Sequence, residues 1–235
     1  MESQNKKRRL CDTDLAIAAT LPADLQRKFI SSLMKGRPYP FYRSARSLYP
    51  SILSVASLVL LPTASTLKKA VVRKCKKGRK GEVPGNQKIV EALREYSIAH
   101  KVIGAVFEHE PAPLGRAGKR HFWYPFILQI DGKKYIPYFD PRQDGGLTPA
   151  ARRFIFSVNN TYIRLQDPTQ YGDVGFVILQ FETLKDGSRR VVAHFDNGVE
   201  FLSDKEIGAL VDAVYLTMDA LEAEREAATK KKKAG

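Results

Sequence analysis

Two β-prone runs joined by Asp131 and Gly132 constrain the fold of this chain more than any other feature of its sequence. Residues 121–130 and 133–139 are rich in aromatic and branched side chains, which favour strands. Asp-Gly is a preferred pair for a two-residue turn, because both positions of that turn need positive φ angles. Strands joined by so short a turn are antiparallel neighbours. The chain is therefore predicted to build its core around a sheet.

The elements around this hairpin predict a fold of the α/β (α+β) class. Asn86 is expected to cap one helix, and Thr148 with Pro149 to start another. Ser203 and Glu206 have the spacing of a capping box, which opens a long final helix. The predicted elements are, in chain order, a helix over 86–100, strands over 102–108, 121–130 and 133–139, a helix over 148–164, strands over 175–181 and 190–195, and the final helix. We expect a central mixed sheet flanked by helices, with an αβββαβ core preceded by a basic helical N-terminal region.

Positive charge gathers in the first third of the chain. Residues 1–80 hold 18 lysines and arginines against four acids, whereas the remaining residues hold 21 of each sign. The whole formal charge of +14 therefore falls in residues 1–80. Charges placed for solubility would not segregate in this way, so the N-terminal region is predicted to attach to a polyanion. Nucleic acid is the leading partner, and membrane phosphates or an acidic protein are the alternatives.

This asymmetry predicts four parts along the chain. Residues 1–19, which are polar and weakly periodic, are expected to form a flexible basic arm. Residues 20–84 are expected to form a basic helical region that binds nucleic acid. Residues 85–221 form the predicted α/β domain, and residues 222–235 a charged C-terminal tail.

Basic residues predicted to contact nucleic acid fall in three places. Over residues 37–49 arginines alternate with aromatic residues, which suits base stacking and phosphate contact; the alternative is a loop whose tyrosines pack on the core. Residues 68–80 carry eight cations and no acid, and the alternative there is a solvated linker or an import-like signal. Two arginines near the start of the 148–164 helix extend the predicted face. The predicted nucleic-acid-binding residues are Arg37, Arg43, Arg46, Lys68, Lys69, Arg73, Lys74, Lys76, Lys77, Arg79, Lys80, Arg152 and Arg153.

The strand before the predicted turn reads Tyr-Pro-Phe-Ile-Leu over 124–128, and the strand after it reads Tyr-Ile-Pro-Tyr over 135–138. With the order of elements over 86–181, these strands resemble the core of the PD-(D/E)XK, or restriction-endonuclease-like, nucleases, including the TnsA-type endonucleases of transposons. In that family an Asp on the second strand and a Glu-x-Lys on the third hold a divalent metal ion and activate water. Phe126 and Ile136 stand at the corresponding places here. The resemblance implies a nuclease-like domain over 85–221, a mobile-element setting, and a lost catalytic motif.

Four carboxylates at other places remain as candidate catalytic residues. They are Glu91, Glu108, Glu110 and Asp140, on a predicted helix or at predicted strand ends. The leading hypothesis is a non-catalytic nucleic-acid-binding protein, with double-stranded DNA favoured over RNA, that acts with protein partners in a nucleoprotein complex. The alternatives are an active metal-dependent DNA endonuclease with displaced carboxylates, and a structural or assembly subunit of a nucleoprotein particle. No cofactor is expected, except Mg²⁺ under the endonuclease alternative.

The sequence favours neither a membrane partner nor secretion. The most apolar stretch, residues 52–61, is shorter than the roughly 20 residues that span a bilayer. The first residues are charged and lack the apolar block of a secretory signal. Cys11 and Cys75 support neither a disulfide framework nor a zinc site. We therefore expect a cytoplasmic protein associated with the nucleoid or another nucleic acid.

Overall fold

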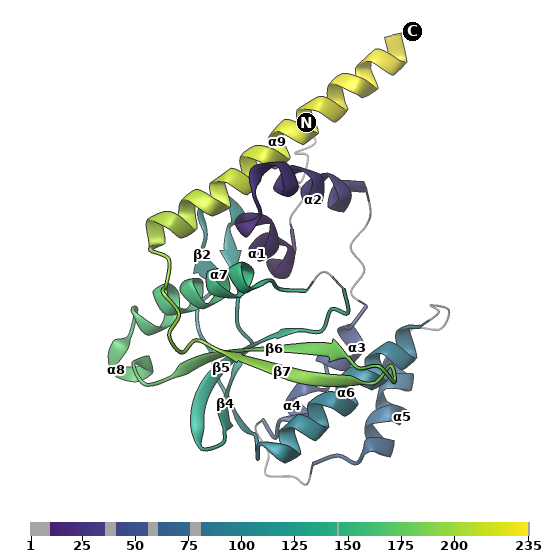
Figure 1. Ribbon diagram of the computed structural model, residues 1–235, viewed down its shortest axis with the longest axis vertical. Coiled ribbons are helices and arrows are strands. Elements are labelled where there is room, and N and C mark those ends of the chain that lie inside the picture. The colour runs from purple at the N-terminus through teal and green to yellow at the C-terminus, as the bar shows by residue number, and fades with distance from the viewer. Residues whose placement is uncertain (1–9, 36–40, 56–60, 76–80, 145, 235) are drawn as a thin grey trace, which may run out of the picture.

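A mixed β-sheet forms the centre of the protein (Figure 1). The structure, a computed structural model, describes residues 10–35, 41–55, 61–75, 81–144 and 146–234. The five strands of this sheet lie in the order β1 (Ile103–Val106), β4 (Phe126–Ile130), β5 (Lys133–Asp140), β6 (Gly175–Thr183) and β7 (Arg189–Phe195). β5 and β6 are parallel, and the other neighbouring pairs are antiparallel. A small second sheet pairs β2 (Ala112–Pro113) with β3 (Lys119–Arg120).

The predicted hairpin is confirmed as the β4–β5 connection. Ile130 lies opposite Lys133, so only Asp131 and Gly132 form the turn. Their φ angles are 48° and 85°, which are the left-handed values that this turn requires. The Asp131 carboxylate also contacts Nδ1 of His100 at 2.8 Å, which ties the turn to the end of a neighbouring helix.

Helices cover both faces of the sheet (Figure 1). The first face is covered by α1 (Asp12–Thr20), α2 (Ala23–Lys35), α7 (Pro149–Asn159) and α9 (Asp204–Ala234), and the second by α3 (Arg43–Arg46), α4 (Tyr49–Ile52), α5 (Ala64–Lys74) and α6 (Glu82–Ala99). Alternate residues of β5 enter the two cores: Ile136 and Tyr138 the first, Tyr135 and Phe139 the second. The predicted α+β class, with a mixed sheet flanked by helices, is therefore confirmed.

The remaining helical turns lie in connections between other elements. They are the 3-10 turn η1 (Gly115–Ala117), the π-helical turn η2 (Asn160–Arg164) that follows α7, and α8 (Pro168–Tyr171). Among the described residues, no helix is both long enough and apolar enough to cross a bilayer.

Two predicted helix starts are confirmed by their hydrogen bonds. The Thr148 hydroxyl accepts from the Ala151 N–H at 3.2 Å and caps α7. At α9 the Glu206 carboxylate accepts from the Ser203 N–H at 2.7 Å, and the Ser203 hydroxyl accepts from the Glu206 N–H at 3.3 Å. This reciprocal pair is a capping box.

The prediction of a flexible arm over residues 1–19 is wrong for the part that the structure describes. Residues 12–20 form α1, and Leu15, Ala16, Ile17, Ala18 and Ala19 are all buried in the first core. The hydrophobic periodicity of this segment is weak because α1 is buried on most of its sides. A helix that is apolar around its whole surface shows no amphipathic pattern. Residues 1–9 lie outside the described residues.

The predicted boundary near residue 84 does not separate two cores. Leu67 and Val71 of α5 share the second core with Ile89 and Leu93 of α6 and with strand residues. In the same way, Ile30 of α2 shares the first core with residues of α7 and α9. A sheet that is apolar on both faces needs cover on both, and the N-terminal helices supply part of each layer.

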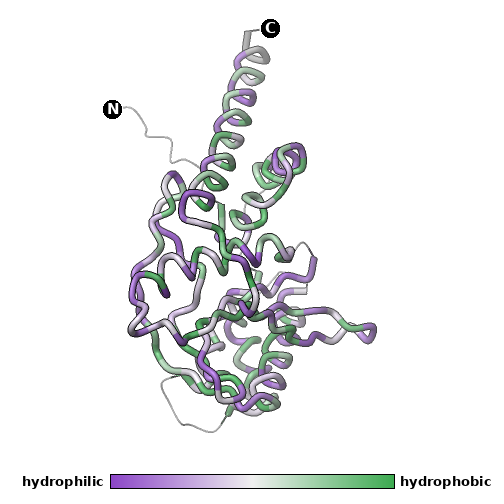
Figure 2. Tube along the Cα trace, turned by 60° about the vertical axis from the view of Figure 1, so that its left-hand side comes forward, coloured by the Kyte–Doolittle hydropathy of each residue, from purple (hydrophilic) through white to green (hydrophobic). Residues whose placement is uncertain are grey.

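The charged C-terminal residues continue α9 rather than form a separate tail. Arg27 of α2 pairs with Glu224 at 2.6 Å, and Arg225 donates to the Met34 carbonyl at 3.2 Å. Beyond these contacts the end of α9 projects from the body, with hydrophilic residues recurring along it (Figure 2).

Asn86 does not cap α6, contrary to the prediction. The helix begins at Glu82, one turn earlier, after Gly81 with a φ of 83°. The fully buried Asn86 side chain instead accepts from the Ala45 N–H at 2.8 Å and donates to the carbonyls of Phe41 and Glu82, each at 2.8 Å. An asparagine fits this helix interior because its amide fixes α3 to α6.

Candidate functional site

A recess with aromatic walls lies beside the end of β5, and we call it the aromatic pocket. Its volume is about 600 Å³, within the range of roughly 300–1,000 Å³ that is usual for ligand sites. Five parts of the chain meet there: the start of α1, the end of α3, the segment after β1, the segment before β4, and the end of β5. Its lining residues are Cys11, Asp12, Thr13, Arg46, Phe107, Glu108, His109, His121, Trp123, Tyr124, Pro125, Tyr138, Phe139 and Arg142.

The walls of the aromatic pocket are fixed by ring contacts. The Trp123 ring meets His109 edge-on, with centroids 5.7 Å apart, and His121 at 5.3 Å. Tyr124 packs edge-on against Phe139 at 4.8 Å. These are favourable aromatic geometries, so the rings support one another without a ligand.

The tyrosines around the aromatic pocket are neutral near pH 7. Burial raises the pKa of Tyr138 well above its ordinary value, although the hydrogen bond from Thr13 opposes the shift. Burial also raises the pKa of Tyr124, against the opposing effect of the Arg46 guanidinium. The Tyr138 hydroxyl is paired with the Thr13 hydroxyl at 2.7 Å. The hydroxyl of the fully buried Tyr49, behind this wall, has no hydrogen-bond partner among the described residues.

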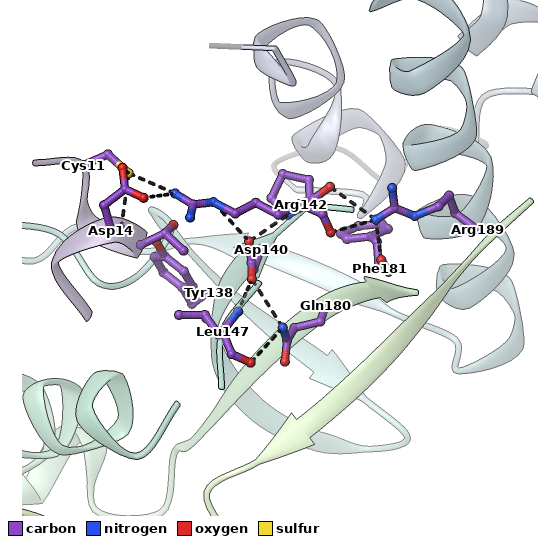
Figure 3. Close-up of polar contacts among 11 residues, drawn as sticks. Cys11, Asp14, Tyr138, Asp140, Arg142, Leu147, Gln180, Phe181 and Arg189 are labelled. Carbon is purple, nitrogen blue, oxygen red and sulfur yellow. Dashed lines mark hydrogen bonds and ion pairs between the residues drawn. The ribbon is translucent and has the colours of Figure 1, made fainter. Parts of the chain in front are cut away.

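Two arginines line the aromatic pocket, but only one has its charge balanced. Arg142 donates to the Asp14 carboxylate at 2.7 Å and lies 3.9 Å from Asp140 (Figure 3). Arg46 is exposed and makes no hydrogen bond or ion pair within the described part of the chain. Arg46 is therefore the cation that this pocket can offer to a ligand.

A polar network behind Arg142 holds the segment that follows β5 (Figure 3). The buried Asp140 carboxylate accepts from the Leu147 N–H at 2.7 Å and from the Gln180 side-chain amide at 3.3 Å. Arg189 donates to the carbonyl of Arg142 at 2.9 Å and to that of Phe181. Because Asp140 is 1% exposed and fully engaged in these contacts, its role in this structure is to hold Arg142 and Leu147 in place after β5.

The candidate catalytic carboxylates do not assemble. Glu91 pairs with Lys68 at 2.5 Å on the α5–α6 side, whereas Glu108 lines the aromatic pocket and Asp140 is buried. Glu110 lies in the exposed segment after β1. Over the residues that the structure describes, no group of three or more His, Cys, Asp or Glu side chains is placed to hold a metal ion.

The predicted basic residues do not form one continuous surface. Lys68, Lys69, Arg73 and Lys74 are exposed on α5, and we call them the basic face. Of these, only Lys68 has an ion-pair partner within the described residues. A shallow groove at this face contains Val72, which is 53% exposed. The basic face is therefore open to an anionic partner.

The other predicted basic residues are placed differently. Arg43 is exposed on α3, one turn before Arg46. Arg152 donates to the Leu147 carbonyl and the Gln180 side chain, and Arg153 donates to the Glu200 carbonyl, so both have intramolecular partners. Arg37, Lys76, Lys77, Arg79 and Lys80 lie outside the described residues.

Sequence reasoning missed the aromatic pocket because half of its wall was assigned to a strand. Residues 121–130 read as one strand, but β4 begins only at Phe126. The segment before it crosses to β5, where the Tyr124 N–H donates to the Pro137 carbonyl at 2.9 Å. Pro125 is the signal that could have shown this break, because proline is rare inside a strand.

The chain is an α+β protein with an aromatic pocket and an open basic face. Such a pocket and such a face are features of proteins that bind other molecules. Residues 13–228 match the family described as "Sliding clamp-binding bacterial toxin SocB". The match covers nearly the whole described structure, from α1 into the last turns of α9. The chain belongs to this family.

A curated relative supports the same assignment. The chain is 29% identical over 217 residues to the "DNA replication inhibitor toxin SocB" of Caulobacter vibrioides (strain NA1000 / CB15N), which covers 89% of this chain and 88% of the relative. No solved structure matches the chain. The predicted connection with DNA agrees with these descriptions in its general form.

Proposed function

We propose that this chain is a toxin that binds the sliding clamp and thereby inhibits DNA replication. The observation that carries the proposal is the family match over residues 13–228. It includes the buried helix α1, both cores and most of α9, so the fold as a whole is shared rather than one motif. The alignment with the replication inhibitor is of similar extent and includes 88% of that protein.

The basic face supports a second contact, with DNA near the clamp. Lys69, Arg73 and Lys74 have no carboxylate partner among the described residues, and each phosphate they meet releases counterions. Such contacts hold any sequence equally, because phosphates carry no sequence information. We propose that the chain binds DNA without reading or cleaving it, and that this binding strengthens its hold on a clamp already engaged in replication.

The relationship with restriction-endonuclease-like nucleases remains a proposal. It is supported by the order α6, β1, β4, β5, α7 and β6 and by the parallel pairing of β5 with β6. Under this relationship the metal-ligand positions are Phe126 and Ile136, which are 2% and 0% exposed and offer no oxygen ligand. We expect plasmid incubated with the chain and Mg²⁺ or Mn²⁺ to remain intact; nicking that disappears in Asp140→Asn would contradict the lost motif.

Primer extension by a clamp-dependent polymerase tests the proposed function. We expect the chain to stop extension when the clamp is present, and added free clamp to relieve the inhibition by titrating the chain. The matched reaction uses a polymerase that extends without a clamp, and it should continue at its normal rate. Equal inhibition of both polymerases, or inhibition that excess clamp does not relieve, would contradict clamp binding as the mechanism.

A further inference from the structure

Arg46 places one unpaired cation at the aromatic pocket. The residue lies on the four-residue helix α3, which Asn86 anchors to α6 through the Ala45 N–H, so its backbone position is fixed by a buried contact. Within the described residues its guanidinium has no carboxylate partner. A guanidinium presents several donors in one plane, which suits a phosphate group.

The remaining charges of the pocket are balanced except for one carboxylate. Asp12 pairs with Arg120 at 3.1 Å, and Arg142 pairs with Asp14 at 2.7 Å. Glu108 is exposed, lines the same pocket and has no partner within the described part of the chain. A matching ligand therefore carries an anionic group for Arg46 and an N–H donor for Glu108.

The aromatic walls of the pocket favour a third feature in the ligand, a planar apolar ring system. Trp123, Tyr124 and Phe107 line the pocket, and its volume of about 600 Å³ is large enough for a ring system with a substituent. Nucleobases stack on aromatic side chains, and each of the four bases has an N–H on its pairing edge. In a duplex that edge is already paired, so among nucleic acids an unpaired base meets all three requirements.

We propose that the aromatic pocket binds one unpaired nucleotide, with its base against Tyr124 and beside the largely buried Trp123, its pairing edge toward Glu108 and its phosphate on Arg46. The nucleotide belongs to single-stranded DNA. α3 contacts α5, so the basic face lies on a helix next to the pocket and can hold neighbouring phosphates of the same strand. This site goes beyond clamp binding and does not depend on it.

Trp123 is the single tryptophan of the chain, so its fluorescence reports on the pocket alone. We expect a single-stranded mixed-sequence oligonucleotide to quench this fluorescence as it binds, because a base held beside the indole changes its surroundings. A blunt duplex of the same sequence should bind to the basic face, as followed by anisotropy of a labelled strand, without quenching Trp123. A deoxynucleoside monophosphate is the third ligand of this titration, and it distinguishes a site for a free nucleotide from a site for a nucleotide within a strand.

Arg46→Ala is the informative variant. Its matched control is Arg43→Ala: the sequence also predicts Arg43 to contact nucleic acid, but the structure places it on the same helix outside the pocket lining. Both residues are exposed, but only Arg46 lines the pocket. We expect Arg46→Ala to weaken single-strand binding by about tenfold, which is the loss of one charge-assisted contact, and Arg43→Ala to change it less than about twofold. Circular dichroism melts of the two variants should match the unaltered chain, which shows that neither effect reflects unfolding.

The outcomes separate the proposal from its competitors. Quenching by the monophosphate at the affinity of the strand would keep the nucleotide site but would overturn its assignment to single-stranded DNA. Strand binding without any change in Trp123 fluorescence, or equal losses in Arg46→Ala and Arg43→Ala, would overturn the site. Quenching by the sliding clamp but not by the strand would assign the pocket to a protein segment and would also overturn it.

Discussion

Replacing Leu15 by alanine tests whether α1 belongs to the core. Leu15 is 0% exposed, and its neighbours Ala16, Ala18 and Ala19 are also buried against the first face of the sheet. A buried Leu→Ala change destabilises proteins by about 2–5 kcal/mol, and by more when the site cannot collapse. The alanines beside Leu15 have no long side chain that can move into the space. We therefore expect a loss of about 3–5 kcal/mol in the free energy of unfolding.

Urea unfolding followed by circular dichroism measures this loss, with Leu25→Ala as the matched control. Leu25 lies on the neighbouring helix α2 and is 45% exposed, so its replacement should change the free energy of unfolding by less than about 1 kcal/mol. If Leu15→Ala destabilised the protein no more than Leu25→Ala, α1 would be a loosely attached arm and not part of the first core.

Three further results are expected. A chain that begins at Gly81 should be unfolded by circular dichroism, because both cores lose helices that cover the sheet; a cooperative melt would contradict the shared core. Asn86→Ala should lower the free energy of unfolding by about 2–4 kcal/mol in the same urea assay, since it leaves the buried Ala45 N–H and the Phe41 carbonyl without their partner. Neutralising Lys69, Arg73 and Lys74 should flatten the slope of log affinity for duplex DNA against log salt concentration by about 2–3 units. An unchanged slope would show that other residues contact the phosphates.

The sequence was sufficient wherever a local signal determines a local structure. Asp131 and Gly132 predict the turn because few other pairs accept its φ angles, and Ser203 with Glu206 predicts the start of α9 from hydrogen bonds within four residues. The mixed sheet follows from these elements, because a hairpin and a later strand separated by a helix leave few arrangements.

The sequence was insufficient wherever distant segments meet. α1 shows no amphipathic period because it is buried between α7, α9 and α2, and that enclosure depends on the whole fold. Asn86 has the residue type of a helix cap, but its partners Phe41 and Ala45 lie more than 40 positions away. The aromatic pocket likewise joins Arg46 to Trp123, which no spacing along the chain could show.

Direct titration of the full chain against the sliding clamp of the same cell tests the central claim. Isothermal calorimetry in the absence of DNA isolates this contact from every contact with phosphates. The account predicts saturable binding, which persists when Lys69, Arg73 and Lys74 are neutralised, because the basic face serves DNA rather than the clamp. Absence of binding by a folded chain, shown by its cooperative melt, would contradict the claim that this protein inhibits replication through the clamp.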